Sequence, residues 1–191
     1  MKRLFCAVKI PPVEEITETL EVFQRELGTE AIKWVAPQNL HITLKFFGET
    51  PNRQVQPIVE ALHRAAAAVP PFGFSVEGCG TFGNPQMPRV IWLGIKDASG
   101  LSELYHEVNH QLEPLGFQPD KKLFTPHLTI GRIKKNIKDI HALNALETEF
   151  SEKPFYQVRV NEFYLIESFL QPVGPVYKVL NTFKPGEGHR A

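Results

Sequence analysis

The sequence has few cysteines, no net charge and no long apolar run, and each shortage excludes a class of protein. Among 191 residues there are two cysteines, Cys6 and Cys79. They are too few for a disulfide framework and lack metal-ligand spacing, a usage typical of a reducing cytoplasm. Basic and acidic residues number 21 each. No whole-protein field therefore attracts polyanions or membranes, and any preference for nucleic acid must be local.

Apolar runs are short throughout the chain. Near the N-terminus, the run from Leu4 to Val8 stops at Lys9, which is too short for a signal peptide. No later segment approaches the roughly 18 consecutive apolar residues of a membrane-spanning helix. The hydrophobic content of 42% is nevertheless sufficient for a core. We therefore expect a soluble cytoplasmic protein without a membrane partner, and a monomer.

An internal repeat organises the chain. Arg3 and Arg89 each begin a β-prone run, "RLFCAVKI" and "RVIWLGIK", and His41 and His127 each begin a second shared string, "HITL" and "HLTI". The offset is the same for both pairs, because 89 − 3 and 127 − 41 both equal 86. Two strings that recur at one offset indicate a duplicated structural plan.

The order of elements in each half is strand, helix, strand, helix, strand, and residues 176–183 add a further strand. This pattern predicts an α+β fold of two pseudo-symmetric lobes, each a mostly antiparallel sheet with helices on its outer face, around a central cleft. We expect one bilobal domain over residues 1–191, with lobe-like repeats at about 1–80 and 89–183. Residues 80–88, "GTFGNPQMP", are predicted to cross between the lobes. The predicted helices cover residues 11–27, 51–69, 98–112 and 136–150.

The two shared strings have the alternation of half-buried strands. Side chains of a strand point to opposite faces in turn, so His41 and Thr43 share one face while the leucine and isoleucine neighbours pack on the other. His127 and Thr129 repeat this arrangement. One such string is a weak signal, since it also fits the polar face of any half-exposed strand. The matched pair predicts two imidazoles and two hydroxyls facing one space.

These four groups suit acid-base chemistry at phosphorus. A neutral imidazole accepts a proton while a protonated partner donates one. Threonine hydroxyls donate hydrogen bonds to charge that develops on oxygen. Hydrolysis of a phosphodiester, especially a strained cyclic one, needs a proton taken from water and another given to the leaving alkoxide. It requires no metal and no covalent nucleophile, but the symmetry leaves open which histidine is the acid.

The strings and their flanks, "NLHITLKFFGE", "FGNPQMPRVIW" and "FTPHLTIGR", resemble the two-histidine phosphoesterase superfamily, and most closely its RNA 2′,3′-cyclic phosphodiesterase branch, once named 2′-5′ RNA ligases. The resemblance covers most of the chain, and both motifs are intact. It implies hydrolysis of RNA-terminal or nucleoside 2′,3′-cyclic phosphate to a 2′-phosphomonoester, without metal or other cofactor. It also implies His41 as proton donor to the departing 3′ oxygen and His127 as the proton acceptor that activates water.

The resemblance further implies substrate contacts five residues beyond each histidine. There Phe46 would contact the base and Arg132 the phosphate, beside the two threonines, Thr43 and Thr129. Strict alternation places Phe46 and Arg132 on the face opposite the histidines, so a bulge at Gly131 or a strand end near it would be needed to redirect Arg132. Core packing is the alternative for Phe46.

A basic patch lies beside the second string. It either holds an RNA backbone through phosphate contacts or is a solvated loop and helix start. Its members are Lys121, Lys122, Arg132, Lys134, Lys135 and Lys138.

The stretch "HEVNH", His106 to His110, matches a zinc-protease pattern. At helical spacing these histidines fall on the face opposite the apolar stripe, so we expect them in solvent and predict no metal site. The apolar stripe consists of Leu101, Leu104, Tyr105, Val108 and Leu112.

Two other functions fit the same cleft. One is a module that binds nucleotides or RNA ends without turnover. The other is 2′-5′ ligation by reversal of the hydrolysis, which we expect to be a minor reaction in water.

Overall fold

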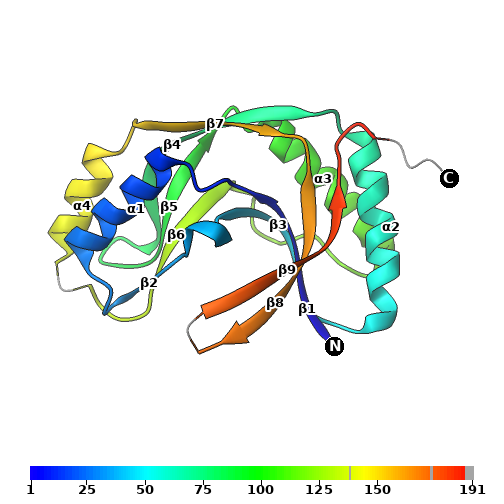
Figure 1. Ribbon diagram of the computed structural model, residues 1–191, viewed down its shortest axis with the longest axis horizontal. Helices are drawn as coiled ribbons and strands as arrows, with labels where there is room; N and C mark the ends of the chain where they lie inside the picture. The colour runs from blue at the N-terminus through cyan, green and yellow to red at the C-terminus, as the bar shows by residue number, and fades with distance from the viewer. Residues whose placement is uncertain (138, 173, 188–191) are drawn as a thin grey trace.

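The chain folds into two antiparallel sheets between helices (Figure 1), seen in a computed structural model that describes residues 1–137, 139–172 and 174–187. The strands are β1 (Lys2–Lys9), β2 (Ile32–Trp34), β3 (His41–Thr50), β4 (Phe72–Asn84), β5 (Met87–Lys96), β6 (His127–Ile133), β7 (Pro154–Val160), β8 (Phe163–Gln171) and β9 (Gly174–Phe183). The helices are α1 (Glu14–Leu27), α2 (Asn52–Ala68), α3 (Ser99–Leu112) and α4 (Ile140–Glu149), with short 3-10 turns at Pro37–Asn39 and Glu113–Leu115.

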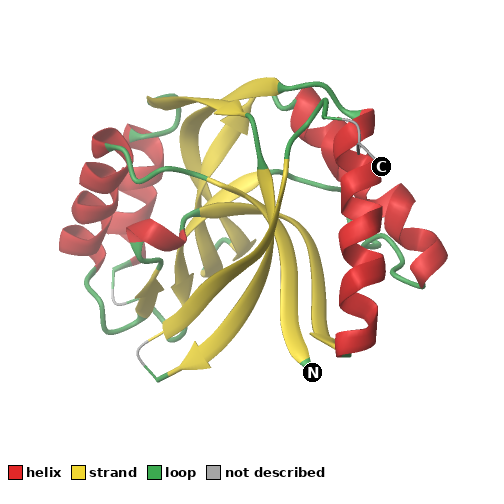
Figure 2. Cartoon of the chain, turned by 45° about the vertical axis from the view of Figure 1, so that its right-hand side comes forward, coloured by secondary structure: helices red, strands yellow, loops and turns green. Residues whose placement is uncertain are grey.

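Sheet A has the strand order β3-β1-β8-β9, and sheet B has the order β2-β6-β5-β4-β7. Helices α2 and α3 pack together on the side of sheet A, whereas α1 and α4 lie on the opposite side of the molecule beside sheet B (Figures 1 and 2). The predicted α+β architecture with antiparallel sheets and outer helices is confirmed. None of the helices in the described ranges has the length and apolarity needed to cross a bilayer.

The sheets do not follow the two halves of the sequence. Strands β2 and β4 from the first half join sheet B, and strands β8 and β9 from the second half join sheet A. The alternation of residues 156–168 in the sequence predicts one continuous strand, and this prediction is wrong. The stretch belongs to two strands, β7 in sheet B and β8 in sheet A, and the chain passes between the sheets at residues 161–162. The two halves therefore exchange strands, and neither sheet is complete without both.

The predicted crossing between lobes at residues 80–88 is wrong. This stretch forms the end of β4, a tight turn and the start of β5, all within sheet B. The turn is held by the amide of Gln86, which donates to Asn84 Oδ1 at 2.9 Å. Gly80 does not interrupt the strand. It allows the ring of Trp92 to pack closely against the backbone, because a Cβ on Gly80 would lie 2.5 Å from that ring.

The helices match their predicted positions because their apolar spacing is strong. On α1, for example, Ile16, Leu20 and Phe23 form the buried stripe, and the helix ends at Gly28, whose φ of 73° few other residues adopt.

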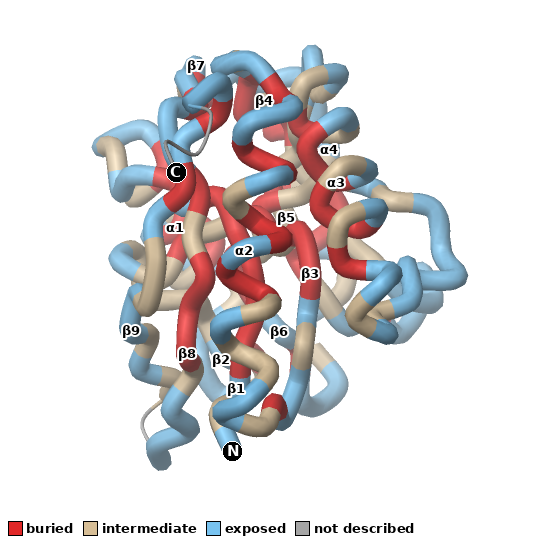
Figure 3. Tube along the Cα trace, turned by 90° about the vertical axis from the view of Figure 1, so that its right-hand side faces the viewer, coloured by how far each residue is buried: buried red, intermediate tan, exposed pale blue. Residues whose placement is uncertain are grey.

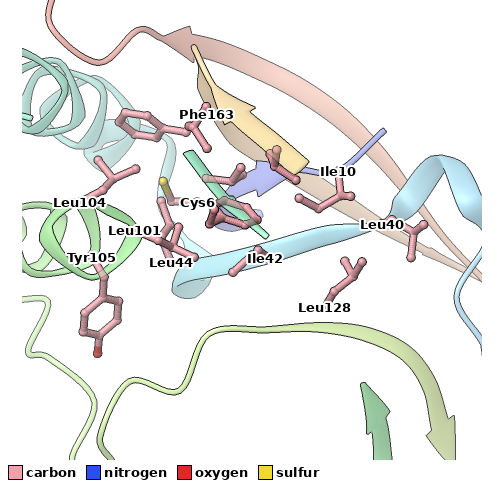
Figure 4. Packing of buried hydrophobic residues seen from close by; sticks show 14 of the residues in the cluster. Cys6, Ile10, Leu40, Ile42, Leu44, Leu101, Leu104, Tyr105, Leu128 and Phe163 are labelled. Atoms are coloured by element: carbon pink, nitrogen blue, oxygen red, sulfur yellow. The ribbon is translucent and has the colours of Figure 1, made fainter. Parts of the chain in front are cut away.

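The core forms between sheet A and its helices and continues toward sheet B (Figures 3 and 4). Alternate residues of β3, Ile42 and Leu44, are buried in it beside Leu101 of α3. Each fully buried side chain of this size contributes about 1.5–3 kcal/mol. This burial fixes the register of β3, and it leaves the intervening side chains on the other face.

Candidate active site

The two motif histidines are the first residues of equivalent strands, His41 of β3 and His127 of β6. Both line one cleft of about 1020 Å³, and so do Thr43 and Thr129. The lining residues come from strands of both sheets and from the loops that precede the two histidines. The structure thus brings together the four side chains that the sequence predicted to share one space.

Each imidazole is anchored in the same way. The Nδ1 atom of His41 lies 2.6 Å from the carbonyl oxygen of Asn39, and that of His127 lies 2.7 Å from the carbonyl oxygen of Thr125. A carbonyl oxygen can only accept, so Nδ1 must carry the hydrogen in both rings. The Nε2 atom is then left for the reaction, as an acceptor when the ring is neutral and as a donor when it is protonated.

A β-bulge in each strand redirects the residue that lies five positions after the histidine. In β3, Lys45 pairs with Cys6 and Thr43 with the next residue of β1, so Leu44 is extra. In β6, Gly131 and Thr129 pair with successive residues of β5, so Ile130 is extra. The two bulges are again 86 residues apart. After a bulge the alternation of faces is reversed.

The bulges turn Phe46 and Arg132 toward the cleft, and both side chains line it. Phe46 is 63% exposed, so the alternative that it packs in the core is wrong. The bulge that was needed to redirect Arg132 is present, and its extra residue is Ile130, one position before Gly131. The geometry therefore makes both side chains available to a ligand held at the histidines.

Aromatic side chains fix the planes of the two imidazoles. The ring of His41 lies 5.0 Å from that of Phe5 and 5.5 Å from that of Tyr177, and the ring of His127 lies 4.7 Å from that of Phe82. The contacts with Tyr177 and Phe82 are edge-to-face and the contact with Phe5 is tilted, and together they limit rotation of the two imidazole rings. Sequence reasoning missed these three contacts, because they depend on which strands are neighbours and no local pattern reports that.

The surroundings lower the pKa of both histidines. Burial lowers the pKa of His41 most, and the charges of Arg132, His127 and Lys9 lower it further, against a hydrogen bond to Asn39 that raises it. For His127, burial is again the largest cause and the charge of Arg132 adds to it. These surroundings therefore favour the neutral form of both rings.

The cleft is locally cationic although the whole chain is neutral. Within the described part of the lining, Asp120 is the only carboxylate. Lys134 and Lys135 of the predicted patch are exposed but do not line the cleft, and Lys138 lies outside the described residues. The excess of positive charge favours an anionic ligand. The cationic lining residues are Lys33, Lys45, Lys121, Lys122 and Arg132.

Lys45 ties the loop before His127 to sheet A. The bulge turns this lysine inward, where it is only 4% exposed, and its Nζ donates to Asn109 Oδ1 of α3 and to the carbonyl oxygen of Gln118. Burial lowers its pKa, and the nearby Asp120 raises it. A lysine within the apolar run "NLHITLKFF" indicates a buried lysine with hydrogen-bond partners, but the sequence analysis did not use this signal.

The zinc-protease pattern is not part of this site. His106 and His110 are exposed on α3, and the apolar stripe of that helix is buried as predicted. Across the described residues, no group of three histidine, cysteine or acidic side chains is arranged to hold a metal ion.

Comparison with known proteins finds the same duplicated plan. The family model described as LigT-like phosphoesterase matches this chain twice in succession, at residues 10–92 and 93–177. The two matches together span most of the sequence, and each contains one of the two histidine motifs.

Curated relatives and solved structures agree with that match. An RNA 2′,3′-cyclic phosphodiesterase of Archaeoglobus fulgidus is 38% identical over 183 residues, which is 95% of this chain and 99% of the relative. One of the same name from Methanothermobacter thermautotrophicus is 34% identical over 95% of this chain and 98% of its own. Among solved structures, TT0787 of Thermus thermophilus has a TM-score of 0.78 at 30% identity, covering 98% of this chain and 100% of that one. E. coli LigT complexed with 3′-AMP shares the fold, with a TM-score of 0.74 at 24% identity over 97% and 99% of the two chains.

Proposed function

The chain belongs to the LigT-like phosphoesterase family, and on that premise we propose that it hydrolyses RNA-terminal or nucleoside 2′,3′-cyclic phosphates to 2′-phosphomonoesters. It acts as a monomer in the cytoplasm, without a metal. The observation that carries this proposal is the pair of imidazoles, from equivalent strands, that line one cleft with both Nδ1 atoms occupied by backbone oxygens.

The reaction uses each Nε2 atom once. Water attacks phosphorus and gives a proton to Nε2 of His127, while the bond from phosphorus to the 3′ oxygen breaks. The departing 3′ oxygen takes a proton from Nε2 of His41. The product is a 2′-phosphomonoester with a free 3′-hydroxyl, and the two histidines exchange protons with solvent before the next turnover. The assignment of acid and base follows the family resemblance, because the local geometry of the two rings is equivalent.

Binding of the substrate helps His41 to become protonated. Burial lowers the pKa of this ring, and the positive charges of Arg132 and Lys9 lower it further. A bound phosphodiester carries a negative charge, which offsets those cations and favours the imidazolium form. The donor is therefore charged most readily when a substrate is present.

The remaining groups of the site stabilise charge on phosphorus. The hydroxyls of Thr43 and Thr129 lie on the cleft face beside the histidines and donate to the non-bridging oxygens. Arg132 pairs with the same anionic group, and Phe46 presents an exposed ring for the terminal base. The same displacement with an RNA 5′-hydroxyl in place of water would form a 2′-5′ linkage as a minor reaction: the 5′ oxygen attacks phosphorus and gives its proton to His127, and the 3′ oxygen departs with a proton from His41.

The test is product analysis after incubation with 2′,3′-cyclic AMP, with and without a chelator. We expect 2′-AMP as the product, and the same rate in the presence of EDTA. Saturable binding of the cyclic nucleotide with no product would favour a binding module instead. A rate that falls with EDTA and recovers with an added divalent cation would contradict the metal-free mechanism.

A further inference from the structure

A tyrosine with a free hydroxyl lies beside His41 in the cleft. Tyr177 of β9 lines the cleft, and its ring packs edge-to-face against His41 at 5.5 Å and against Phe5 at 5.0 Å. These ring contacts use no polar atom of the tyrosine. Among the described residues, the Tyr177 hydroxyl has no hydrogen-bond partner. Since tyrosine hydroxyls in partly buried positions usually have one, this donor is available to a ligand.

The backbone beside Tyr177 is held at the cleft by a contact between the two edges of sheet A. Strands β3 and β9 are the outer strands of that sheet, yet Asn39 Nδ2, in the loop before β3, donates to the carbonyl oxygen of Pro175 at 3.2 Å. The backbone oxygen of Asn39 also accepts from Nδ1 of His41. One asparagine therefore connects the anchor of His41 to the strand that carries Tyr177, and the two rings keep a fixed relation to each other.

The phenol lies near the cation that is proposed to bind the phosphate. Burial raises the pKa of Tyr177, and the charges of Arg132 and Arg3 lower it. The charge of Arg132 also acts on His41. Because His41 belongs to sheet A and Arg132 to sheet B, a phenol close to both lies where the phosphate would bind. The net pKa is raised, so the hydroxyl keeps its hydrogen at neutral pH and can donate it.

The phosphate otherwise has fewer donors on the side of sheet A than on the side of sheet B. In the proposed mechanism, sheet B provides Thr129 and Arg132. Sheet A provides Thr43, and Phe46 lies at the position equivalent to Arg132, since 132 − 46 is again 86. A phenylalanine ring has no polar hydrogen to donate to an anion. The hydroxyl of Tyr177 supplies the missing donor on that side.

We propose that the hydroxyl of Tyr177 donates a hydrogen bond to a non-bridging oxygen of the phosphate, which makes Tyr177 a further catalytic residue. Negative charge increases on that oxygen as water attacks phosphorus, so the bond strengthens in the transition state. The tyrosine keeps its hydrogen throughout, and the two proton transfers remain with the histidines. This inference rests on the proposed function and adds to it a residue outside both histidine motifs.

The test is steady-state hydrolysis of 2′,3′-cyclic AMP by Tyr177→Phe, which removes the hydroxyl and keeps the ring beside His41 and Phe5. We expect kcat/KM to fall on the order of tenfold, the effect of one hydrogen bond to a charged group. Both limbs of the pH profile should stay in place, because the hydroxyl is uncharged over that range. An unchanged kcat/KM would overturn the proposal. So would limbs that move, because Tyr177 would then act through the histidines.

Tyr164→Phe is the matched control. Tyr164 packs against the same small apolar cluster around Ile166 as Tyr177 does, but its hydroxyl donates to the carboxylate of Glu162. It is not among the described residues that line the cleft. The same chemical change at this position should therefore leave kcat/KM unchanged. Equal losses in the two variants would attribute the effect to packing of the cluster and would reject the contact with phosphate.

Inhibition by parts of the product locates the contact on the ligand. Inorganic phosphate and 2′-AMP contain the group that Tyr177 would contact, whereas adenosine lacks it. Tyr177→Phe should raise the inhibition constants of phosphate and 2′-AMP about tenfold and leave that of adenosine unchanged. If the inhibition constants of 2′-AMP and adenosine rise while that of phosphate stays the same, the tyrosine contacts the nucleoside and the proposal is wrong.

Binding separates failure of this contact from failure of the proposed function. If the natural protein releases no product from 2′,3′-cyclic AMP, the proposed function is wrong, and calorimetric titration with inorganic phosphate then tests the contact alone. Binding that is weaker in Tyr177→Phe than in the natural protein and in Tyr164→Phe would support the contact. Equal affinity in all three proteins, or binding by none of them, would reject it.

Discussion

Replacing either motif histidine with alanine is expected to reduce kcat for a 2′,3′-cyclic nucleotide by about 10²–10⁴-fold, the range by which positioned acids and bases accelerate reactions. In the proposed mechanism each Nε2 performs one proton transfer, and among the described residues that line the cleft His41 and His127 are the only imidazoles. Steady-state hydrolysis of 2′,3′-cyclic AMP measures the effect, and His41→Gln and His127→Gln separate loss of the proton from loss of ring volume beside Phe5, Tyr177 and Phe82.

His106→Ala is the matched control for these variants. His106 is exposed on α3 and does not line the cleft, so its removal should leave kcat unchanged. The double variant His41→Ala/His127→Ala should be little worse than either single variant, because the two rings act in one step. More than a tenth of the original rate in either single variant would contradict an acid-base pair.

Arg132→Gln is expected to lower kcat/KM on the order of 10- to 100-fold, since it removes a hydrogen bond between charged groups, and also to move the pH profile. The positive charge of Arg132 contributes to the lowered pKa of both His41 and His127. The natural protein should therefore have its optimum of kcat/KM below about pH 6.5, the ordinary pKa of histidine. Removing the charge favours the imidazolium form, so both limbs of the profile should shift to higher pH.

The pH shift distinguishes an electrostatic role from a purely structural one. Arg132→Lys keeps the charge and loses the two-pronged geometry, so it should lower kcat/KM while the limbs of the profile stay in place. The measurement is kcat/KM for 2′,3′-cyclic AMP between about pH 5 and pH 9. If the pH profile of Arg132→Gln coincides with that of the natural protein, Arg132 does not influence the pKa values of the two histidines.

The repeat and the alternation of side chains predicted much of this site. His41, Thr43, His127 and Thr129 line one cleft because each pair shares a strand face, and this property depends only on local spacing. The four helices were also predictable from apolar periodicity. Local sequence patterns were therefore sufficient to predict the features that depend only on local backbone geometry.

The features that could not be predicted from the sequence depend on pairing between distant segments. Nothing in the sequence near β8 or β2 indicates that these strands join the sheet built around the other half, because periodicity predicts that a strand exists and not its partner. The positions of the two bulges could not be predicted from the sequence either. The one in β3 buries Lys45, a residue that hydrophobicity alone places on the solvent side, and its cost is offset by the oxygens of Asn109 and Gln118. We propose that the whole chain works as a single bilobal domain, which this exchange of strands supports.

The convergence of two imidazoles on one phosphate is tested most directly by nitrogen-15 NMR of the histidine rings during titration with 2′-AMP, with His41 and His127 assigned through their single variants. We expect both rings to carry hydrogen on Nδ1 in the free protein, and one equivalent of 2′-AMP to shift Nε2 of both and to raise both pKa values. A ligand that perturbs only one of the two rings, or a free protein with hydrogen on Nε2 of either, would contradict the account.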